Sequence, residues 1–180
     1  HNSAAEAKLE PIASSPGPGA TDALVDLVTH RAMLGQSVTE EQVASLEAAL
    51  EERSGSSDEA RYRSALVLAK AASGDFDAAF TEAGSPEALR QIWKILAQSG
   101  GDTPLLTHAV LAEGQTPPPE AEASAGLIAD RLLMLGLADQ AQRWVVLAPA
   151  APPLLRARIA LANGDASGAL ELLKDDSSEQ

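Results

Sequence analysis

Apolar residues recur every three or four positions along most of the chain from about residue 21 onward. One stripe holds Leu24, Leu27 and Val28, and another holds Ile92 and Leu96. This period is that of an amphipathic α-helix with one face turned toward a core. β-branched residues are sparse and no run alternates apolar with polar residues, so strands are not predicted. The pattern indicates an all-α fold of about ten short helices.

Residues typical of helix ends divide this pattern into separate helices. Gly74 suits the left-handed residue that follows a helix, and Asp75 suits the N-cap of the next one. Thr39 opens a capping box with Gln42, and Ser85 precedes a proline at the first helical position. The predicted helices cover about 21–34, 39–53, 58–72, 75–83, 85–99, 103–113, 120–135, 138–147, 154–162 and 166–174.

A glycine recurs where one predicted helix turns into the next. The corners that define five pairs of helices are Gly35, Gly74, Gly101, Gly136 and Gly164. Neighbouring corners lie 27 to 39 residues apart, which brackets the roughly 34-residue spacing of helical-hairpin repeats. Three of these glycines are followed after five residues by an alanine: Ala79, Ala141 and Ala169. We expect these alanines where paired helices approach most closely, because a small side chain lets two backbones come together.

The corner Gly74-Asp75-Phe76, with Ala79 after it, resembles the corner of a tetratricopeptide repeat. The corners at Gly136 and Gly164 match in part, whereas Lys70 stands where this family has a bulky apolar residue. The resemblance covers roughly 60–176, and 21–53 more weakly. It implies an irregular α-solenoid of five stacked antiparallel hairpins, which would bind a partner through an extended surface.

The composition divides the chain into three parts. Residues 1–20 hold Pro, Gly and Ser without an apolar period, which predicts a disordered arm or linker. Residues 21–176 form a single predicted helical-repeat domain, and 177–180 form a frayed acidic tail. Gln115–Pro119 is interpreted as a stiff spacer, with a ligand for a proline-reading domain as the alternative.

The net charge is −13 with an isoelectric point near 4.5, so nucleic acid and anionic lipid are not expected partners. The chain lacks Cys and has no apolar run long enough to cross a membrane. It begins at His1 rather than Met, which suggests a processed or truncated form. Together with the linker, these features favour the bacterial periplasm or cell envelope, with a tether to the membrane through residues preceding the arm. The alternative is the cytoplasm.

Groups that carry chemistry are scarce. His30 and His108 lie in unrelated helices without a second ligand at metal-binding spacing, and we expect both to be partly exposed. Consecutive acids on a helix point apart, so they do not form a pair of carboxylates across a cleft. No nucleophile elbow or phosphate loop occurs. Trp93 and Trp144 are interpreted as core anchors, with lining of a ligand groove as the alternative. We predict no catalytic residues, metal or cofactor.

The resemblance also implies which residues would line a binding groove. In stacked hairpins the first helix of each pair lines the concave side, at positions about 13, 10 and 6 before the corner. Those positions hold Arg61, Ser64, Arg90, Lys94, Asp130 and Arg158. Four of them are cationic, which would suit the carboxylates of an acidic peptide. The alternative is ordinary solvated charge on helix faces.

The function predicted from these features is a non-enzymatic scaffold or protein–protein interaction module that binds a partner protein or peptide segment. The first alternative is a helical accessory region of a larger cell-envelope enzyme. The second is a plain helical bundle with a pocket for a small ligand.

Overall fold

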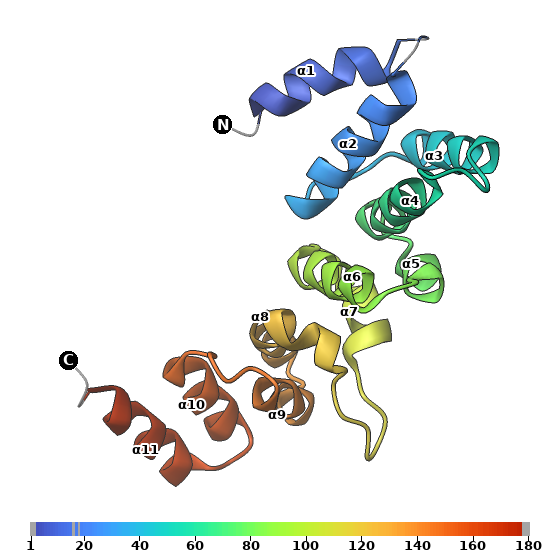
Figure 1. Cartoon of the computed structure of the whole chain (residues 1–180). Helices are drawn as coiled ribbons and strands as arrows, with labels where there is room; N and C mark the ends of the chain where they lie inside the picture. Colours follow the sequence, from blue (N-terminus) through green and yellow to red (C-terminus); the bar gives the residue numbers. More distant parts are fainter. Residues whose placement is uncertain (1–2, 16, 18, 178–180) are drawn as a thin grey trace. The chain divides into compact units, whose positions relative to one another are not determined.

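The computed structural model of the protein describes residues 3–15, 17 and 19–177, and the regular structure of these residues is entirely helical, as predicted. The described residues form eleven α-helices and one short 3-10 helix, shown in chain order in Figure 1. Their bounds are α1 Ser3–Ala13, α2 Ala20–Met33, α3 Glu40–Glu52, α4 Glu59–Ser73, α5 Phe76–Glu82, α6 Pro86–Gln98, α7 Asp102–Ala109, η1 Pro119–Ala121, α8 Glu122–Met134, α9 Ala138–Val146, α10 Pro153–Ala162 and α11 Ala166–Ser177.

The chain separates into two compact units, and the span 21–176 that was predicted as one helical-repeat domain runs through both. The first unit covers residues 1–99 and the second covers residues 100–180. The boundary lies between α6 and α7, which were predicted to form one pair of helices. Gly100 and Gly101 fall at this boundary, and helix-breaking residues of this kind suit a connection between units.

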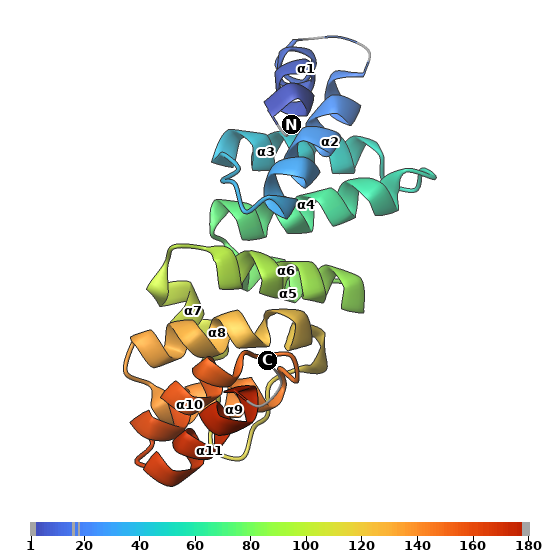
Figure 2. The ribbon, with the colours of Figure 1, turned by 90° about the vertical axis from the view of Figure 1, so that its left-hand side faces the viewer.

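The first unit is built around α2 and α4, which pack against each other, with α3 against both helices and α5 and α6 against α4. Figure 2 shows α3 and α4 lying alongside each other. Leu46 of α3 and Tyr62 and Ala69 of α4 are fully buried in the shared core. Helical periodicity places these side chains on inward faces, and their burial supplies the main driving force for packing.

Residues 3–13 form helix α1, so the prediction of a disordered arm is wrong for this part of the chain. α1 packs against α2, and Ala13 lies against the core of the first unit. Arg31 of α2 donates a hydrogen bond of 3.0 Å to Glu10 of α1. Pro11 lies in the last turn of α1, where it lacks the N–H that would donate to the carbonyl of Ala7. Of the linker predicted after it, Pro16 and Pro18 lie outside the described residues.

Four of the five predicted corner glycines end a helix in the same way. Gly35, Gly74, Gly136 and Gly164 have φ between 70° and 100°, in the left-handed region that a side chain disfavours. At each corner the glycine N–H donates to the carbonyl three residues back. The next N–H donates to the carbonyl five residues back. This is the Schellman arrangement, and it satisfies carbonyls that the helix end would leave unpaired.

The fifth corner, Gly101, is different. Its φ is −87°, and it is the residue before α7 rather than the residue after α6. The helices predicted to begin near residues 21 and 103 begin slightly earlier, since α2 follows Gly19 and α7 follows Gly101. The N-caps at Thr39, Asp75 and Ser85 are confirmed, because each side chain accepts an N–H hydrogen bond from the first turn of its helix.

The second unit contains two tightly packed pairs, α8 with α9 and α10 with α11, and α9 also packs against α10. Trp144 of α9 is fully buried, and its Nε1–H donates to the carbonyl of Ala109 at 2.7 Å. The prediction that both tryptophans are core anchors is confirmed, since Trp93 is also buried. The frayed tail predicted over 177–180 begins at a residue that is still helical, and 178–180 lie outside the described residues.

α7 ends at Ala109, four residues before the predicted end at Glu113. The reason is a clamp from α9. Gln140 accepts from the Leu111 N–H at 3.0 Å and donates to its carbonyl at 3.2 Å. Arg143 donates to the carbonyl of Ala112 at 2.9 Å. The backbone groups that a longer helix would pair internally are therefore satisfied by side chains from another helix.

Candidate interaction surface

The six residues predicted to line a groove fall in both units. Arg61 and Ser64 lie on α4, and Arg90 and Lys94 lie on α6, all in the first unit. Asp130 on α8 and Arg158 on α10 lie in the second unit. Four of the six residues therefore belong to the first unit and two belong to the second.

Arg61 binds carboxylates of its own chain. Its guanidinium donates to Asp22 at 2.9 Å and to Asp26 at 2.7 Å, both on α2. The hydrogen bond to Asp26 is the main reason that the pKa of Arg61 is raised. Tyr62 beside it is buried, and its hydroxyl donates to Asp22 at 3.0 Å. Burial first, and then this carboxylate, raise the pKa of Tyr62. These groups join α4 to α2.

Two of the other three candidates in the first unit, Arg90 and Ser64, also bind groups of their own helix. Arg90 donates to Glu87, one turn earlier on α6, at 2.6 Å. The hydrogen bond from Gln91, followed by the contact with Arg90, lowers the pKa of Glu87. The hydroxyl of Ser64 donates to the carbonyl of Ala60 in its own helix. Lys94 is half-buried and makes no hydrogen bond or ion pair with the described part of the chain.

The two candidates of the second unit bind each other. Arg158 of α10 donates to Asp130 of α8 at 2.9 Å, and both residues stand six positions before their corner glycine. Asp22 and Arg61 also occupy equivalent positions, since each lies 13 residues before its own corner glycine, Gly35 or Gly74. At both places, equivalent positions of successive first helices carry opposite charges. Arg61 and Arg158 therefore have their charge matched by carboxylates of another helix, and both join helices.

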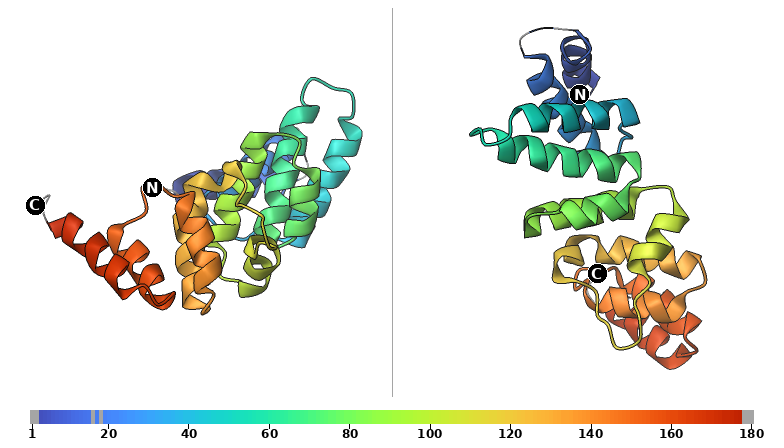
Figure 3. Two further views of the ribbon diagram at one scale, coloured as in Figure 1. Left: turned by 90° about the horizontal axis from the view of Figure 1, so that it is seen from below. Right: turned by 90° about the vertical axis from the view of Figure 1, so that its right-hand side faces the viewer.

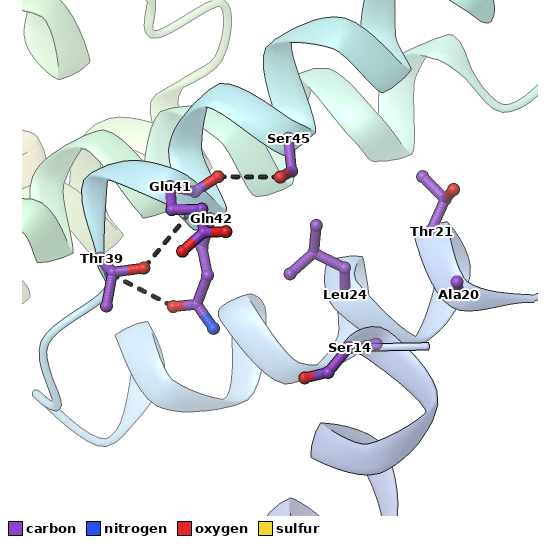
Figure 4. A pocket seen from close by; sticks show the side chains of 9 residues that line it. Ser14, Ala20, Thr21, Leu24, Thr39, Glu41, Gln42 and Ser45 are labelled. Carbon is purple, nitrogen blue, oxygen red and sulfur yellow. Dashed lines mark hydrogen bonds between the residues drawn. The ribbon is translucent and has the colours of Figure 1, made fainter. Parts of the chain in front are cut away.

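Each unit has hollows on its surface that described residues line, and three of them are considered in turn. In the first unit, a hollow of about 310 Å³ lies between the α1–α2 turn and the start of α3. Figure 4 shows its lining, which includes Leu24 and the hydroxyls of Ser14 and Thr21. Thr39 and Gln42 also line it, but their polar groups are engaged in the capping box that opens α3. One wall of this hollow is therefore formed by the capping box of α3, whose polar groups are already hydrogen-bonded to each other.

A second hollow of the first unit is lined mostly by charged groups of α3 and α4. Lys70 at its edge is largely buried, and its amine donates to Glu82 at 2.8 Å and lies 3.1 Å from Glu47. Burial alone would lower the pKa of Lys70, but the hydrogen bonds to Glu82 and Glu47 outweigh it and raise the pKa. Lys70 thus buries its stem among neighbouring side chains, and its amine joins α4 to α3 and α5.

The third hollow lies in the second unit and is the most apolar of the three. Its volume is about 610 Å³, and it lies between residues 114–117 and the last turn of α9. Val146 and Leu147 form one wall and Pro117 forms another. The Arg143 guanidinium at its edge is held by the backbone carbonyls of Leu111 and Ala112.

No group of three or more His, Asp or Glu side chains suited to a metal ion occurs among the described residues. His30 and His108 are half-buried on separate helices, in agreement with the prediction that both are partly exposed. Within the same residues, no helix is long and apolar enough to cross a membrane.

Comparison with protein-family models, with curated proteins and with solved structures finds no match for this chain.

Exposed apolar side chains were not predicted from the sequence, and most of those in the described part of the chain lie in the second unit. In the first unit the large apolar side chains left exposed are Ile12, Met33 and Leu34. In the second unit they are Leu106, Val110, Leu127, Met134, Leu135, Val146, Leu154, Leu161, Leu170 and Leu173. A signal was present in the sequence, because these helices carry apolar residues outside the inward stripe. The helical period alone does not show whether a second stripe is covered.

Two of these residues form a stripe on α8. Leu127 is 45% exposed and Met134 is 75% exposed, and seven residues, or two helical turns, separate them. Asp130, with its ion pair to Arg158, lies between them along the helix. The fully buried Ile128 and Leu132 define the opposite, inward face of the same helix. α8 therefore has an apolar face toward the core and a second apolar stripe toward solvent, which we call the α8 stripe.

Proposed function

We propose that the protein is a non-enzymatic protein–protein interaction module, of tetratricopeptide-like type, which binds a partner segment on the α8 stripe. The observation that carries the proposal is the exposure of Leu127 and Met134 on one face of a helix whose other face is buried. Covering such side chains is favourable by about 25 cal/mol per Å² of apolar surface removed from water. A stripe of this kind is typical of a surface that recognises an apolar segment.

The charge of the second unit indicates the chemistry of the partner. Residues 100–180 hold eleven Asp and Glu against five Lys and Arg. Four of those five cations, Arg131, Arg143, Arg156 and Arg158, donate hydrogen bonds within the chain. A segment with apolar anchors and basic flanking residues is therefore favoured over the acidic peptide that the sequence pattern suggests, because opposite charges speed and orient association.

The proposal is supported by the position of the stripe in the fold. α8 is the first helix of its pair, and the tetratricopeptide resemblance assigns partner binding to first helices. Met134 adds a flexible thioether side chain, which adapts to different apolar partners. The stripe is carried by a helix whose inner face is fixed by buried Ile128, Ala129 and Leu132. Binding would therefore cost little ordering of the backbone.

The experiment is selection from a random peptide display library against the whole protein, followed by fluorescence anisotropy with the enriched peptides. We expect enriched peptides to combine apolar and basic residues and to bind in the micromolar range. Met134→Glu and Leu127→Glu should each weaken binding by about tenfold or more, because a carboxylate would be buried against apolar groups.

The matched control is Val146→Glu. Val146 is as exposed as Met134, at 76%, but lies on α9 rather than on the stripe. It should leave peptide binding unchanged. Enriched peptides that bind the Met134→Glu and wild-type proteins equally well, or a library that yields no peptide, would contradict the proposal.

A further inference from the structure

The apolar hollow of the second unit lies between the loop that follows α7 and the last turn of α9. Figure 3 shows this loop, in yellow, beside the orange helices of the same unit. The volume of about 610 Å³ falls within the range that is usual for small-molecule sites in proteins. Pro117, Val146 and Leu147 supply aliphatic walls, and no aromatic ring occurs among the described residues that line the hollow. Walls of this kind suit an alkyl group.

Arg143 carries the one charge among the described residues that line this hollow. Its Nη1 donates to the carbonyl of Ala112 at 2.9 Å and to that of Leu111 at 3.4 Å, which fixes the position of the guanidinium. Within the described chain no carboxylate binds Arg143, and neither its Nε nor its Nη2 has a hydrogen-bond partner. The N–H groups on the Nε–Nη2 edge of a guanidinium match the two oxygens of a carboxylate. Arg143 therefore has an unused carboxylate-binding edge in a hollow with aliphatic walls.

The other arginines in the described part of the second unit lack this combination. Arg131 and Arg158 each have a carboxylate partner in the chain. Arg156 is held by two backbone carbonyls, as Arg143 is, but it does not line the hollow and its Nε is buried. Arg143 thus differs from Arg131 and Arg158 in having no carboxylate partner, and from Arg156 in its apolar surroundings.

We propose that this hollow binds a small monocarboxylate with an aliphatic chain, such as a medium-chain fatty acid. The carboxylate forms two parallel hydrogen bonds with the Nε–Nη2 edge of Arg143, and the alkyl chain lies against Pro117, Val146 and Leu147. Charge-assisted bidentate pairs are among the strong hydrogen bonds in proteins, and each buried methylene adds to the affinity. The site shares no residue with the α8 stripe and takes a ligand of different chemistry, so it goes beyond the proposed function.

The acidity of the second unit makes the charge of the ligand a decisive property. Residues 100–180 hold eleven Asp and Glu against five Lys and Arg, a net charge of −6. The overall field of this unit therefore attracts a cationic amphiphile more strongly than an anionic one. A preference for an anionic head group would have to come from a local cation, and Arg143 is the cation at this hollow.

Titration of the whole protein with octanoate, followed by two-dimensional ¹H–¹⁵N NMR, measures the binding and locates it. We expect a Kd of about 0.1 to 1 mM, with shifts concentrated at residues 114–117 and 143–147. Hexanoate, octanoate and decanoate, each below its micelle-forming concentration, should gain about twofold to fourfold in affinity for each added methylene. 1-Octanol and octylammonium have the same alkyl chain and should bind about tenfold more weakly than octanoate, because neither offers a carboxylate to Arg143.

Two substitutions in the hollow test its residues. Val146→Glu is compatible with the fold, because Val146 is 76% exposed. It places a second carboxylate among the aliphatic walls and should weaken octanoate binding by about tenfold or more. Arg143→Gln should weaken binding to a similar degree, whereas Arg143→Lys keeps the charge without the planar fork and should retain part of the affinity.

The matched control is Arg156→Gln, which removes an arginine that is also held by two backbone carbonyls but lies outside the hollow. It should leave octanoate binding unchanged, as should Met134→Glu on the α8 stripe. Circular dichroism checks that all variants keep their helix content.

Octylammonium or 1-octanol binding as tightly as octanoate would overturn the proposal. So would octanoate binding that Val146→Glu leaves intact, shifts located away from the hollow, or no binding at about 10 mM octanoate. Loss of peptide binding in Met134→Glu with intact octanoate binding separates this inference from the proposed function, because the two rest on different residues.

Discussion

The two units of the molecule join their helices by different kinds of polar contact. In the first unit, side chains of opposite charge meet: Arg61 binds Asp22 and Asp26, and Lys70 binds Glu82. In the second unit, side chains mostly donate to backbone carbonyls of another segment. Arg131 donates to Gly101, and Trp144 donates to Ala109. Gln140 and Arg143 bind the 111–112 backbone in the same way.

The difference has a consequence for stability and for function. Ion pairs at a surface respond to salt and pH, and their net contribution is small. A hydrogen bond to a buried carbonyl does not titrate at ordinary pH, and its loss leaves an unsatisfied polar group. The same contrast appears on the outside, where the second unit exposes more large apolar side chains than the first. We therefore expect electrostatic sensitivity in the first unit and partner binding in the second.

The largest effect is expected from Trp144→Ala in the second unit. The substitution empties the space of a fully buried indole and leaves the Ala109 carbonyl without its donor. The expected loss is about 3–5 kcal/mol of unfolding free energy, measured by urea denaturation followed by circular dichroism.

Trp144→Phe is the matched control, since it keeps much of the volume and removes the N–H donor. It should cost about 1–3 kcal/mol, with little change in about 1 M NaCl, because no ion pair is involved. If Trp144→Ala cost less than Trp144→Phe, the indole would not anchor α9 to the end of α7.

An intermediate loss of unfolding free energy is expected from Ala→Leu substitutions at the helix corners, a feature that both units share. Ala79 in the first unit and Ala141 in the second are fully buried after Schellman corners, where α4 meets α5 and α8 meets α9. Each Ala→Leu substitution adds three heavy atoms to a packed contact, which costs about 1–3 kcal/mol. Ala169, buried after the third such corner, should behave in the same way.

Each unit offers an exposed control: Ala48 on α3 and Ala123 on α8. Leucine at these positions should change the unfolding free energy by less than about 0.5 kcal/mol. If denaturant melts showed Ala79→Leu to be as harmless as Ala48→Leu, the Gly-to-Ala spacing would have no packing meaning.

The smallest effect is expected from Lys70→Met in the first unit. The pKa of Lys70 is raised in the folded protein, so its stabilising contribution is fully present below the unfolded pKa of 10.5 and is lost as pH rises through the folded value. Below that range the substitution should cost about 1 kcal/mol or less, and the cost should shrink in about 1 M NaCl.

Urea melts at about pH 8 and about pH 11.5 measure this dependence. The raised pKa of Tyr62 acts in the same direction, because a folded state that favours the neutral phenol loses stability once the unfolded chain ionises. Lys70→Met should therefore reduce, but not abolish, the alkaline loss of wild-type stability. An equal cost of the substitution at both pH values would show that the ion pairs contribute nothing.

Local features of the fold were predictable from the sequence wherever the deciding interactions span a few residues. Thr39 caps α3 through Gln42, and Asp75 caps α5 through the N–H of Ala78. α1 was missed because its Pro, Gly and Ser neighbours suggested a linker, while its order depends on packing against α2. The end of α7 was missed because it depends on Gln140 and Arg143, about 30 residues further along the chain.

The sequence by itself determined the all-helical class and the four glycine corners, because helical period and chain reversal are properties of neighbouring residues. Only the tertiary structure decided whether the predicted groove cations are free to bind a partner or are paired within the chain. Arg61 and Arg158 read as free charges along the chain, but Asp22, Asp26 and Asp130 lie within hydrogen-bonding distance once helices pack. Packing likewise decided that Leu132 is buried while Met134, two residues later, is exposed. Burial depends on which elements cover a helix, and that information lies far away in the sequence.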